Sequence, residues 1–301
     1  MENLYSIAEV KSYEIVEKIL EGCSGDEKYK LKKDGKYFLL RISEKAKISE
    51  KRKEYDQLTG YMNTDIHTHT PILFGTNADI VYSIVSWVDG MPVMDLIKKD
   101  TSKNYYELGK KVGRELKKLH SCYPDAPKAG WKDIVEKKAL RFLENYRRMK
   151  AVFESSKNAE QYTMENICLM ADRPQTLLHG DFHWNNCVAD EEGNVGIIDF
   201  SGGNTGDPWY EFGGLLWALE YSDSFANGQI DGYFDTIPDG FWKIFKFYVA
   251  LYAFEHLSYS NGTPEDIKNH ILNAGRMIHI FGKNFELDLP LFRTKLQEAD
   301  L

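Results

Sequence analysis

The sequence predicts an α+β protein of two lobes, a small N-terminal antiparallel sheet lobe and a larger, mainly helical C-terminal lobe. Three observations support this prediction. Short runs rich in β-branched and aromatic residues fill much of residues 28–88. Apolar residues at helical spacing dominate from residue 103 onward. The chain has 301 residues and is 43% hydrophobic, which is enough for two hydrophobic cores.

The first lobe is expected to span residues 1–88, with a hinge near 84–90. Its predicted elements are a helix at 5–21, strands at 28–32 and 36–43, a helix at 47–62, and strands at 71–75 and 79–88. Asp34-Gly35 lies between two β-rich runs, which is a strong hairpin signal. In the helix at 47–62, Ile48, Tyr55 and Leu58 recur at near-helical spacing.

The second lobe is expected to span residues 89–301. Its predicted helices lie at 103–120, 131–150, 158–170, 208–221, 241–259 and 264–281. One short hairpin, at 187–190 and 195–200, interrupts this helical pattern.

Cysteine spacing and the N-terminus bound the compartment. The four cysteines show no CxxC spacing, which argues against a structural zinc site and a disulfide framework. The first 20 residues lack the basic and apolar segments of a signal peptide, and no run approaches the ~20 apolar residues of a membrane span. We therefore expect a cytoplasmic protein without membrane contact, and no obligate protein partner is evident.

The charge distribution says more than the net charge of −8. Residues 174–242 contain 12 Asp and Glu but no Lys or Arg. Such a stretch repels nucleic acid and attracts metal ions or cationic ligands. It can also be a solvated acidic loop region.

The chemistry-bearing motif surrounds the predicted hairpin. His179-Gly180-Asp181 is followed by four residues and then Asn186, and Asp199 follows the apolar pair Ile197-Ile198. Asp-x4-Asn followed by Asp across a hairpin is the layout of a kinase catalytic loop. There, Asp181 would accept the proton of the attacking hydroxyl. Asn186 and Asp199 would hold Mg²⁺, which prefers hard oxygen ligands.

The segments LHGDFHWNN, GIIDF and GDPWYEF resemble the aminoglycoside phosphotransferase family, relatives of choline kinases within the protein-kinase-like fold. Three further segments are similar to family features: RISEKAKISEKRKEYDQL to a third strand and glutamate helix, IVSWVDGMPV to the hinge, and LGKKVGRELKKLHS to the helix ending in Leu-x-His. The resemblance covers most of residues 20–220 and implies a bilobal kinase-like fold.

The resemblance implies a nucleotide site for ATP or GTP. His179 would brace the catalytic loop, Arg41 would grip the phosphates, and Glu54 would be the ion-pair partner of Arg41. The remaining nucleotide contacts would come from the loop residues Ser24 and Gly25 and from the backbone of the hinge residues Ser86 and Val88. Two departures from the family pattern are Arg41 in place of Lys and a glycine-rich loop reduced to Gly-Cys-Ser-Gly.

The acceptor is expected to be a cationic small molecule, and an aminoglycoside-type antibiotic is the first interpretation. The acidic stretch would supply its contacts through Asp207, Glu211, Glu220 and Asp223. Asp207 would also have a structural role, tying the loop after Asp199 to the catalytic segment. The protein-kinase signatures HRD, DFG and APE are absent, which disfavours a protein substrate.

Several alternatives remain open at this point. The same layout serves kinases of choline, methylthioribose, homoserine, fructosamine and macrolides. A nucleotide-binding pseudokinase would keep the fold without activity. A metal-dependent hydrolase could use His67 and His69 with His179, Asp181, His183 and Asp199.

Overall fold

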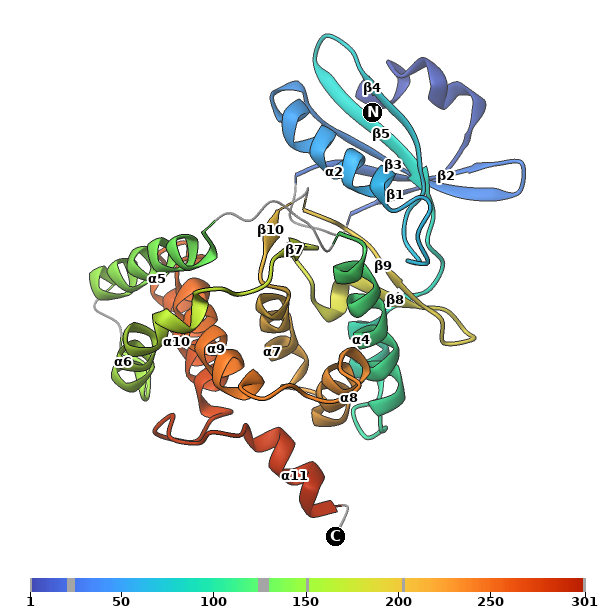
Figure 1. The fold of residues 1–301 in the computed structure, drawn as a ribbon. Helices are drawn as coiled ribbons and strands as arrows, with labels where there is room; N and C mark the ends of the chain where they lie inside the picture. Colours follow the sequence, from blue (N-terminus) through green and yellow to red (C-terminus); the bar gives the residue numbers. More distant parts are fainter. Residues whose placement is uncertain (1, 21–24, 124–129, 150–151, 202–203, 300–301) are drawn as a thin grey trace. The chain divides into compact units, whose positions relative to one another are not determined.

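The computed structural model describes residues 2–20, 25–123, 130–149, 152–201 and 204–299 (Figure 1). The chain forms two compact units. The first comprises Met1–Val93, His179–Asp181 and Asn185–Asn204, and the second comprises Met94–Leu178, Phe182–Trp184 and Thr205–Leu301. Two short segments from the middle of the chain thus belong with the N-terminal sheet. The division into lobes at residues 88 and 89 stays a prediction.

A five-stranded antiparallel sheet forms the first unit, in the order β1-β2-β3-β5-β4. Its strands are β1 (Glu14–Ile19), β2 (Glu27–Lys33), β3 (Lys36–Glu44), β4 (Pro71–Thr76) and β5 (Ile80–Ser86). The predicted hairpin at Asp34-Gly35 is confirmed: both residues have positive φ, 50° and 75°, as a two-residue type I′ turn requires.

Side-chain alternation gives this sheet two different faces. Tyr29, Leu31, Leu40 and Ile84 pack on one face in a single core. That core also includes residues of α1 (Glu2–Tyr5) and of the 3₁₀ helix η1 (Ala8–Ser12), namely Leu4, Ile7 and Val10. Residues of the alternate set, such as Arg41, Ser83 and Val85, share a pocket with the helix α2 (Ile48–Gly60). The polar chemistry of the unit therefore gathers on the face opposite its apolar core.

A smaller sheet completes the first unit. It pairs β6 (Met91–Pro92) with β8 (Cys187–Ala189) and β8 with β9 (Val195–Ile197), so the predicted hairpin near 187–200 is confirmed. A β-bridge joins Thr68 to Ile197. This pairing holds the segment that ends at Asp199 beside the residues that precede β4.

The second unit is helical apart from a two-stranded ribbon of β7 (Thr176–Leu177) and β10 (Thr205–Gly206). Its α-helices are α3 (Val93–Lys99), α4 (Tyr106–Ser121), α5 (Trp131–Arg148), α6 (Ser156–Asn166), α7 (Leu215–Ala218), α8 (Asp223–Tyr233), α9 (Phe241–Leu257), α10 (Pro264–His279) and α11 (Leu291–Ala299). Its described 3₁₀ segments include η3 (Ile167–Met170) and η5 (Pro208–Gly214). Most of α9 is buried, as expected for a helix that is apolar all round.

Glycines let α4 and α8 approach each other closely (Figure 1). A Cβ atom on Gly113 would lie 2.1 Å from the Gln229 carbonyl oxygen, and one on Gly109 would lie 2.2 Å from that of Phe225. Gly228 and Gly232 meet the α4 backbone in the same way. The two backbones pack at a distance that excludes any larger side chain at these positions.

The α+β fold class predicted from the sequence is confirmed, but some elements differ. The helix predicted at 5–21 is wrong: residues 14–19 form β1, an edge strand that pairs with β2. The predicted helix at 208–221 is a 3₁₀ segment, η5, followed by the short α7. None of the helices among the described residues combines the length and apolarity that crossing a membrane requires.

Candidate active site

His179 connects the two segments that carry the predicted catalytic residues. Its Nε2 lies 2.9 Å from the Ile198 carbonyl oxygen, and its Nδ1 accepts a hydrogen bond of 3.2 Å from the Asp181 backbone N–H. A carbonyl can only accept, so these two bonds fix the tautomer with hydrogen on Nε2. The ring is fully buried and packs on Phe200 at 4.5 Å between centroids. This geometry suits the bracing role that the resemblance implies for His179.

Gly180 is required by the closeness of these two segments. Its φ is 90°, a value that favours glycine. A Cβ atom there would lie 1.7 Å from the Ser201 Oγ. Ser201 in turn donates from its backbone N–H and its hydroxyl to the His179 carbonyl oxygen, at 3.0 and 3.1 Å. The residues just before Asp181 are therefore held against Ser201, which lies two positions after Asp199.

Asp181 and Asn186 lie side by side. The Asn186 side-chain Nδ2 donates to the Asp181 backbone oxygen at 2.9 Å and to the Asp181 carboxylate Oδ2 at 3.2 Å. Because Nδ2 faces Asp181, the other end of the Asn186 amide, Oδ1, remains to serve as an oxygen ligand. The backbone carbonyl of Asn186 also accepts a hydrogen bond of 2.9 Å from the Ile198 N–H. This bond ties Asn186 to the segment that carries Asp199.

Asp199 has a backbone conformation that is uncommon for residues other than glycine, with φ at 65°. Its Oδ1 accepts a hydrogen bond of 2.6 Å from Arg41 Nη1, and its Oδ2 lies 3.9 Å from Lys28 Nζ. Burial raises the pKa of the Asp199 carboxyl, but the charges of Arg41 and Lys28 outweigh burial, and the pKa lies below its usual value. The carboxylate is therefore ionised and available to a cation.

Arg41 has a different carboxylate partner from the one predicted. Besides Asp199, it donates to Asp26 Oδ2 at 3.1 Å, whereas Glu54 pairs with Lys51 at 2.9 Å. Lys51 also contacts Asp26, at 3.0 Å. The expected direct Arg41–Glu54 ion pair is corrected to a chain in which Lys51 and Asp26 stand between them. Lys51 lies one helical turn before Glu54 on α2, and its ammonium group contacts both Glu54 and Asp26.

Asp26 is the centre of this charge network. Its side chain is fully buried, and it also accepts a hydrogen bond of 2.7 Å from Ser43 Oγ. Burial raises the pKa of the Asp26 carboxyl, but the hydrogen bonds from Ser43 and Lys51 outweigh burial and bring the pKa down to about 2. Sequence reasoning missed Asp26 and Lys51, since a lone acid after a loop and a lysine on a helix carry no recognisable spacing.

The two predicted hinge residues differ in the availability of their backbones. The Ser86 N–H donates to the Thr70 oxygen at 2.8 Å, and the Ser86 oxygen accepts from His69 Nδ1 at 2.7 Å. Both main-chain groups of Ser86 are thus already used, which does not fit the adenine contact expected for it. No main-chain hydrogen bond involves Val88 in the described part of the chain. Val88 remains the hinge residue with free backbone groups.

Of the two loop residues predicted to contact the nucleotide, Gly25 lies in the described part of the chain. Ser24 lies outside the described residues. Gly25 has φ at 72°, and a Cβ atom on it would meet nothing within 4 Å. Its backbone conformation, rather than close packing, therefore favours glycine there.

The four carboxylates expected to bind the acceptor have cationic or neutral partners within the second unit. Asp207 is fully buried and pairs with Arg173 at 2.6 and 3.0 Å, while Tyr248 donates to it at 2.6 Å. Glu211 is also buried, 2.8 Å from His120 Nε2. Acceptor contact by Asp207 and Glu211 does not fit this burial, and we assign both a structural role.

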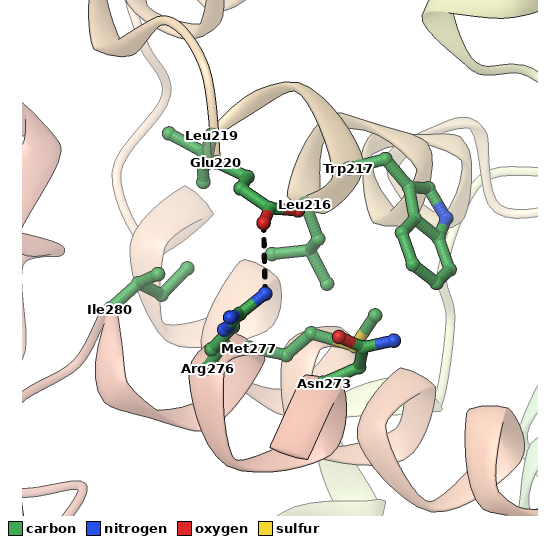
Figure 2. A pocket seen from close by; sticks show the side chains of 8 residues that line it. All are labelled: Leu216, Trp217, Leu219, Glu220, Asn273, Arg276, Met277 and Ile280. Atoms are coloured by element: carbon green, nitrogen blue, oxygen red, sulfur yellow. Dashed lines mark hydrogen bonds and ion pairs between the residues drawn. The ribbon is translucent and has the colours of Figure 1, made fainter. Parts of the chain in front are cut away.

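The other two carboxylates lie at the surface. Asp223 pairs with Lys295 at 2.9 Å, and Glu220 pairs with Arg276 at 2.9 Å. Figure 2 shows Glu220 and Arg276 in direct contact with each other, and both line a cavity of about 210 Å³ beside α7 and α10. Glu220 is thus the one of the four predicted carboxylates that lines this cavity. Several carboxylates of the acidic stretch pair with cations from other parts of the chain, so its composition alone does not indicate an acceptor site.

The predicted hydrolase centre does not form. Among the described residues, no group of three or more His, Cys, Asp or Glu side chains is arranged to hold a metal ion. His69 uses Nδ1 on the Ser86 carbonyl, and burial lowers its pKa to about 4. It lines a small pocket with Arg41 and Asp199, which makes it a neutral wall of the candidate nucleotide site.

The five-stranded sheet and the arrangement of Asp181, Asn186 and Asp199 fit the phosphotransferase class that the sequence resemblance implies. The family model of the phosphotransferase enzyme family matches residues 15–241, and the chain belongs to that family. A search of curated proteins finds no match. The comparison with solved structures supports the fold.

Three solved structures illustrate the likeness. One is a thermostable mutant of aminoglycoside phosphotransferase APH(4)-Ia in ternary complex with ADP and hygromycin B, at 16% identity and a TM-score of 0.69, covering 91% of this chain and 97% of that chain. The second is a putative fructosamine-3-kinase from Haemophilus somnus 129PT, at 14% identity and a TM-score of 0.61, covering 93% of this chain and 98% of that chain. The third is the aminoglycoside phosphotransferase APH(3'')-Id from Streptomyces rimosus in complex with ADP and streptomycin. It has 15% identity and a TM-score of 0.53, covering 80% of this chain and 91% of that chain.

Proposed function

We propose that this phosphotransferase is a small-molecule kinase that moves the γ-phosphoryl group of ATP or GTP to a hydroxyl group. The observation that carries the proposal is the hydrogen-bonded arrangement of Asp181, Asn186 and the Asp199 segment around His179. Asp181 orients the acceptor hydroxyl and takes its proton. The acceptor oxygen forms a bond to the γ-phosphorus as the bond to the leaving nucleoside diphosphate breaks.

The oxygen ligands fit a magnesium ion. Asn186 Oδ1 and the Asp199 carboxylate are hard oxygen donors on adjoining segments. Neither of them is a soft ligand of the kind that selects zinc. Magnesium held there would neutralise negative charge on the nucleotide phosphates during transfer. When the nucleotide binds, Arg41 would release Asp199 and contact a phosphate group instead.

The Arg41 guanidinium supports a phosphate nearby. Its Nε is buried and has no hydrogen-bond partner among the described residues. A buried donor without an acceptor is costly, and a phosphate oxygen would satisfy it. Val88, with free backbone groups, is the proposed contact for the nucleobase.

For the acceptor, we propose an aminoglycoside-type molecule first and a fructosamine second. Two of the similar structures are named as aminoglycoside phosphotransferases in complex with hygromycin B or streptomycin, and one as a putative fructosamine-3-kinase. Both acceptor classes carry sugar hydroxyls near amino groups. The printed names of these structures are the support for both classes, since identities of 14–16% and the paired carboxylates of the second unit favour neither.

The test is magnesium-dependent release of ADP and GDP by purified protein against aminoglycosides, fructosamines, choline, methylthioribose, homoserine and macrolides. We expect turnover with at least one hydroxyl acceptor, lost on addition of EDTA. Turnover with a fructosamine and none with aminoglycosides would replace the first acceptor by the second. Tight nucleotide binding without turnover on any acceptor would contradict the proposal and favour a pseudokinase.

A further inference from the structure

The side chain of Lys28 lies beside Arg41 because of strand register. Lys28 on β2 is directly opposite Arg41 on β3. Cross-strand partners project to the same face of a sheet. Their neighbours Tyr29 and Leu40 project to the other face, where both are buried in the apolar core. The sheet therefore presents two cations next to each other on its polar face.

Lys28 has no strong partner there. Its side chain is only 13% exposed. Within the described residues, its ammonium group has one ion pair, with Asp199 Oδ2 at 3.9 Å, and donates no hydrogen bond. Arg41 already binds the other oxygen of the same carboxylate at 2.6 Å. A nearly buried ammonium group is costly unless it is paired and hydrogen-bonded, so this position calls for an additional anion.

The local charge balance identifies the kind of anion. The ion-paired cluster at this face is balanced, with four cations and four carboxylates among the described residues, namely Lys28, Arg41, Lys47, Lys51, Asp26, Asp199, Glu50 and Glu54. A divalent cation on Asp199 would leave the cluster with excess positive charge. The phosphates of a nucleotide carry the negative charge that restores the balance.

We infer that Lys28 is a second phosphate-binding cation, acting with Arg41 on the nucleotide phosphates. This inference rests on the proposed kinase function. Lysine acts as a compact point charge with three rotatable donors, whereas Arg41 offers a rigid planar fork. Together they would hold two phosphate oxygens from one side of the sheet. The pair compensates for a glycine loop reduced to Gly-Cys-Ser-Gly.

The experiment measures nucleotide affinity by calorimetry with magnesium present, for ATP, GTP and adenosine. Lys28→Met should weaken binding of the triphosphate about tenfold and leave adenosine, which lacks phosphates, unchanged. Lys28→Arg should retain most of the affinity because it keeps the charge. Lys32→Met is the matched control, on the same strand and outside the charge cluster, and should bind like the wild type.

The possible failures are distinguishable. If the wild type binds triphosphate and Lys28→Met binds it equally well, the role of Lys28 is overturned and the kinase proposal stands. If Lys28→Met weakens adenosine and triphosphate to the same extent, Lys28 is a structural residue and the inference is wrong. If the wild type binds neither ATP nor GTP, the proposed function fails and the role of Lys28 fails with it.

Discussion

At the scale of single residues, the charge network on the sheet explains how Arg41 is held. Arg41 and Lys51 both donate to Asp26, whose side chain is fully buried. Among the described residues, Glu54 forms an ion pair with Lys51 and none with Arg41. Asp26 is therefore the carboxylate that positions Arg41, and Glu54 supports it through Lys51.

The replacement Asp26→Asn should destabilise the protein by about 2–4 kcal/mol, because it leaves two buried cations short of a partner. Glu54→Gln should cost less, on the order of 1 kcal/mol, since Lys51 keeps Asp26. Urea unfolding of both variants measures the two free energies. The assignment of Asp26 as the central carboxylate is wrong if Glu54→Gln proves the more damaging change.

At the scale of secondary-structure elements, the α4–α8 contact depends on glycines that admit a backbone-to-backbone approach. This pair of helices holds His120 on α4 next to Tyr233 on α8, with the Tyr233 hydroxyl 3.0 Å from His120 Nδ1. His120 in turn contacts Glu211. The helix spacing thus sets the position of a buried polar group in the segment that follows the catalytic loop.

Adding one methyl group at this contact should be costly. Gly113→Ala would place a Cβ atom 2.1 Å from the Gln229 carbonyl oxygen, so we expect a loss of stability of about 2–3 kcal/mol. Gly275→Ala on α10 is the matched control, because its nearest atom is 4.0 Å away. There, alanine should stabilise the helix by about 0.5–1 kcal/mol. Thermal unfolding of the two variants should shift in opposite directions; a common direction would refute this account of the packing.

At the scale of the whole molecule, each unit contains a buried neutral histidine. Burial lowers the pKa of His69 in the first unit to about 4. Burial, followed by the charge of His270, lowers the pKa of His256 in the second unit to about 4, and Asp266 opposes this effect. Unfolding releases both to an ordinary value near 6.5, so the unfolded chain binds more protons between these pH values.

The protein should therefore lose stability as the pH falls from about 6.5 to about 4, with the full contribution of both groups present above pH 6.5. Chemical unfolding at pH 7 and pH 5 measures the difference. His256→Gln removes one of the two titrating groups and should reduce the loss between these pH values. An unchanged loss in this variant would show that His256 does not contribute.

Part of this molecule could be predicted from its sequence because some signals are local. The Asp34-Gly35 turn and the spacing from His179 to Asp199 each depend on a few neighbouring residues, and the structure contains the expected hairpins. Other features depend on pairing across the chain. Residues 14–19 read as a helix because their strand exists only through pairing with β2.

Charge compensation was also invisible along the chain. Lys117 on α4 pairs with Asp235, and Lys295 on α11 pairs with Asp223, although 118 and 72 residues separate the partners. An acidic stretch therefore looks unpaired in the sequence while several of its carboxylates form ion pairs with residues distant in the chain. The same reason hid Asp26, whose partners come from β3 and α2.

The central claim is that Asp181 is the base of a phosphoryl-transfer site. Its most direct test is the turnover number of Asp181→Asn with the best acceptor, measured together with the dissociation constant of the magnesium–nucleotide complex. Asp190→Asn, in the turn between β8 and β9, is the matched control. The account predicts a fall in kcat of about 10²–10⁴-fold with nucleotide affinity nearly unchanged, and full activity in the control. Near-normal kcat in Asp181→Asn would contradict it.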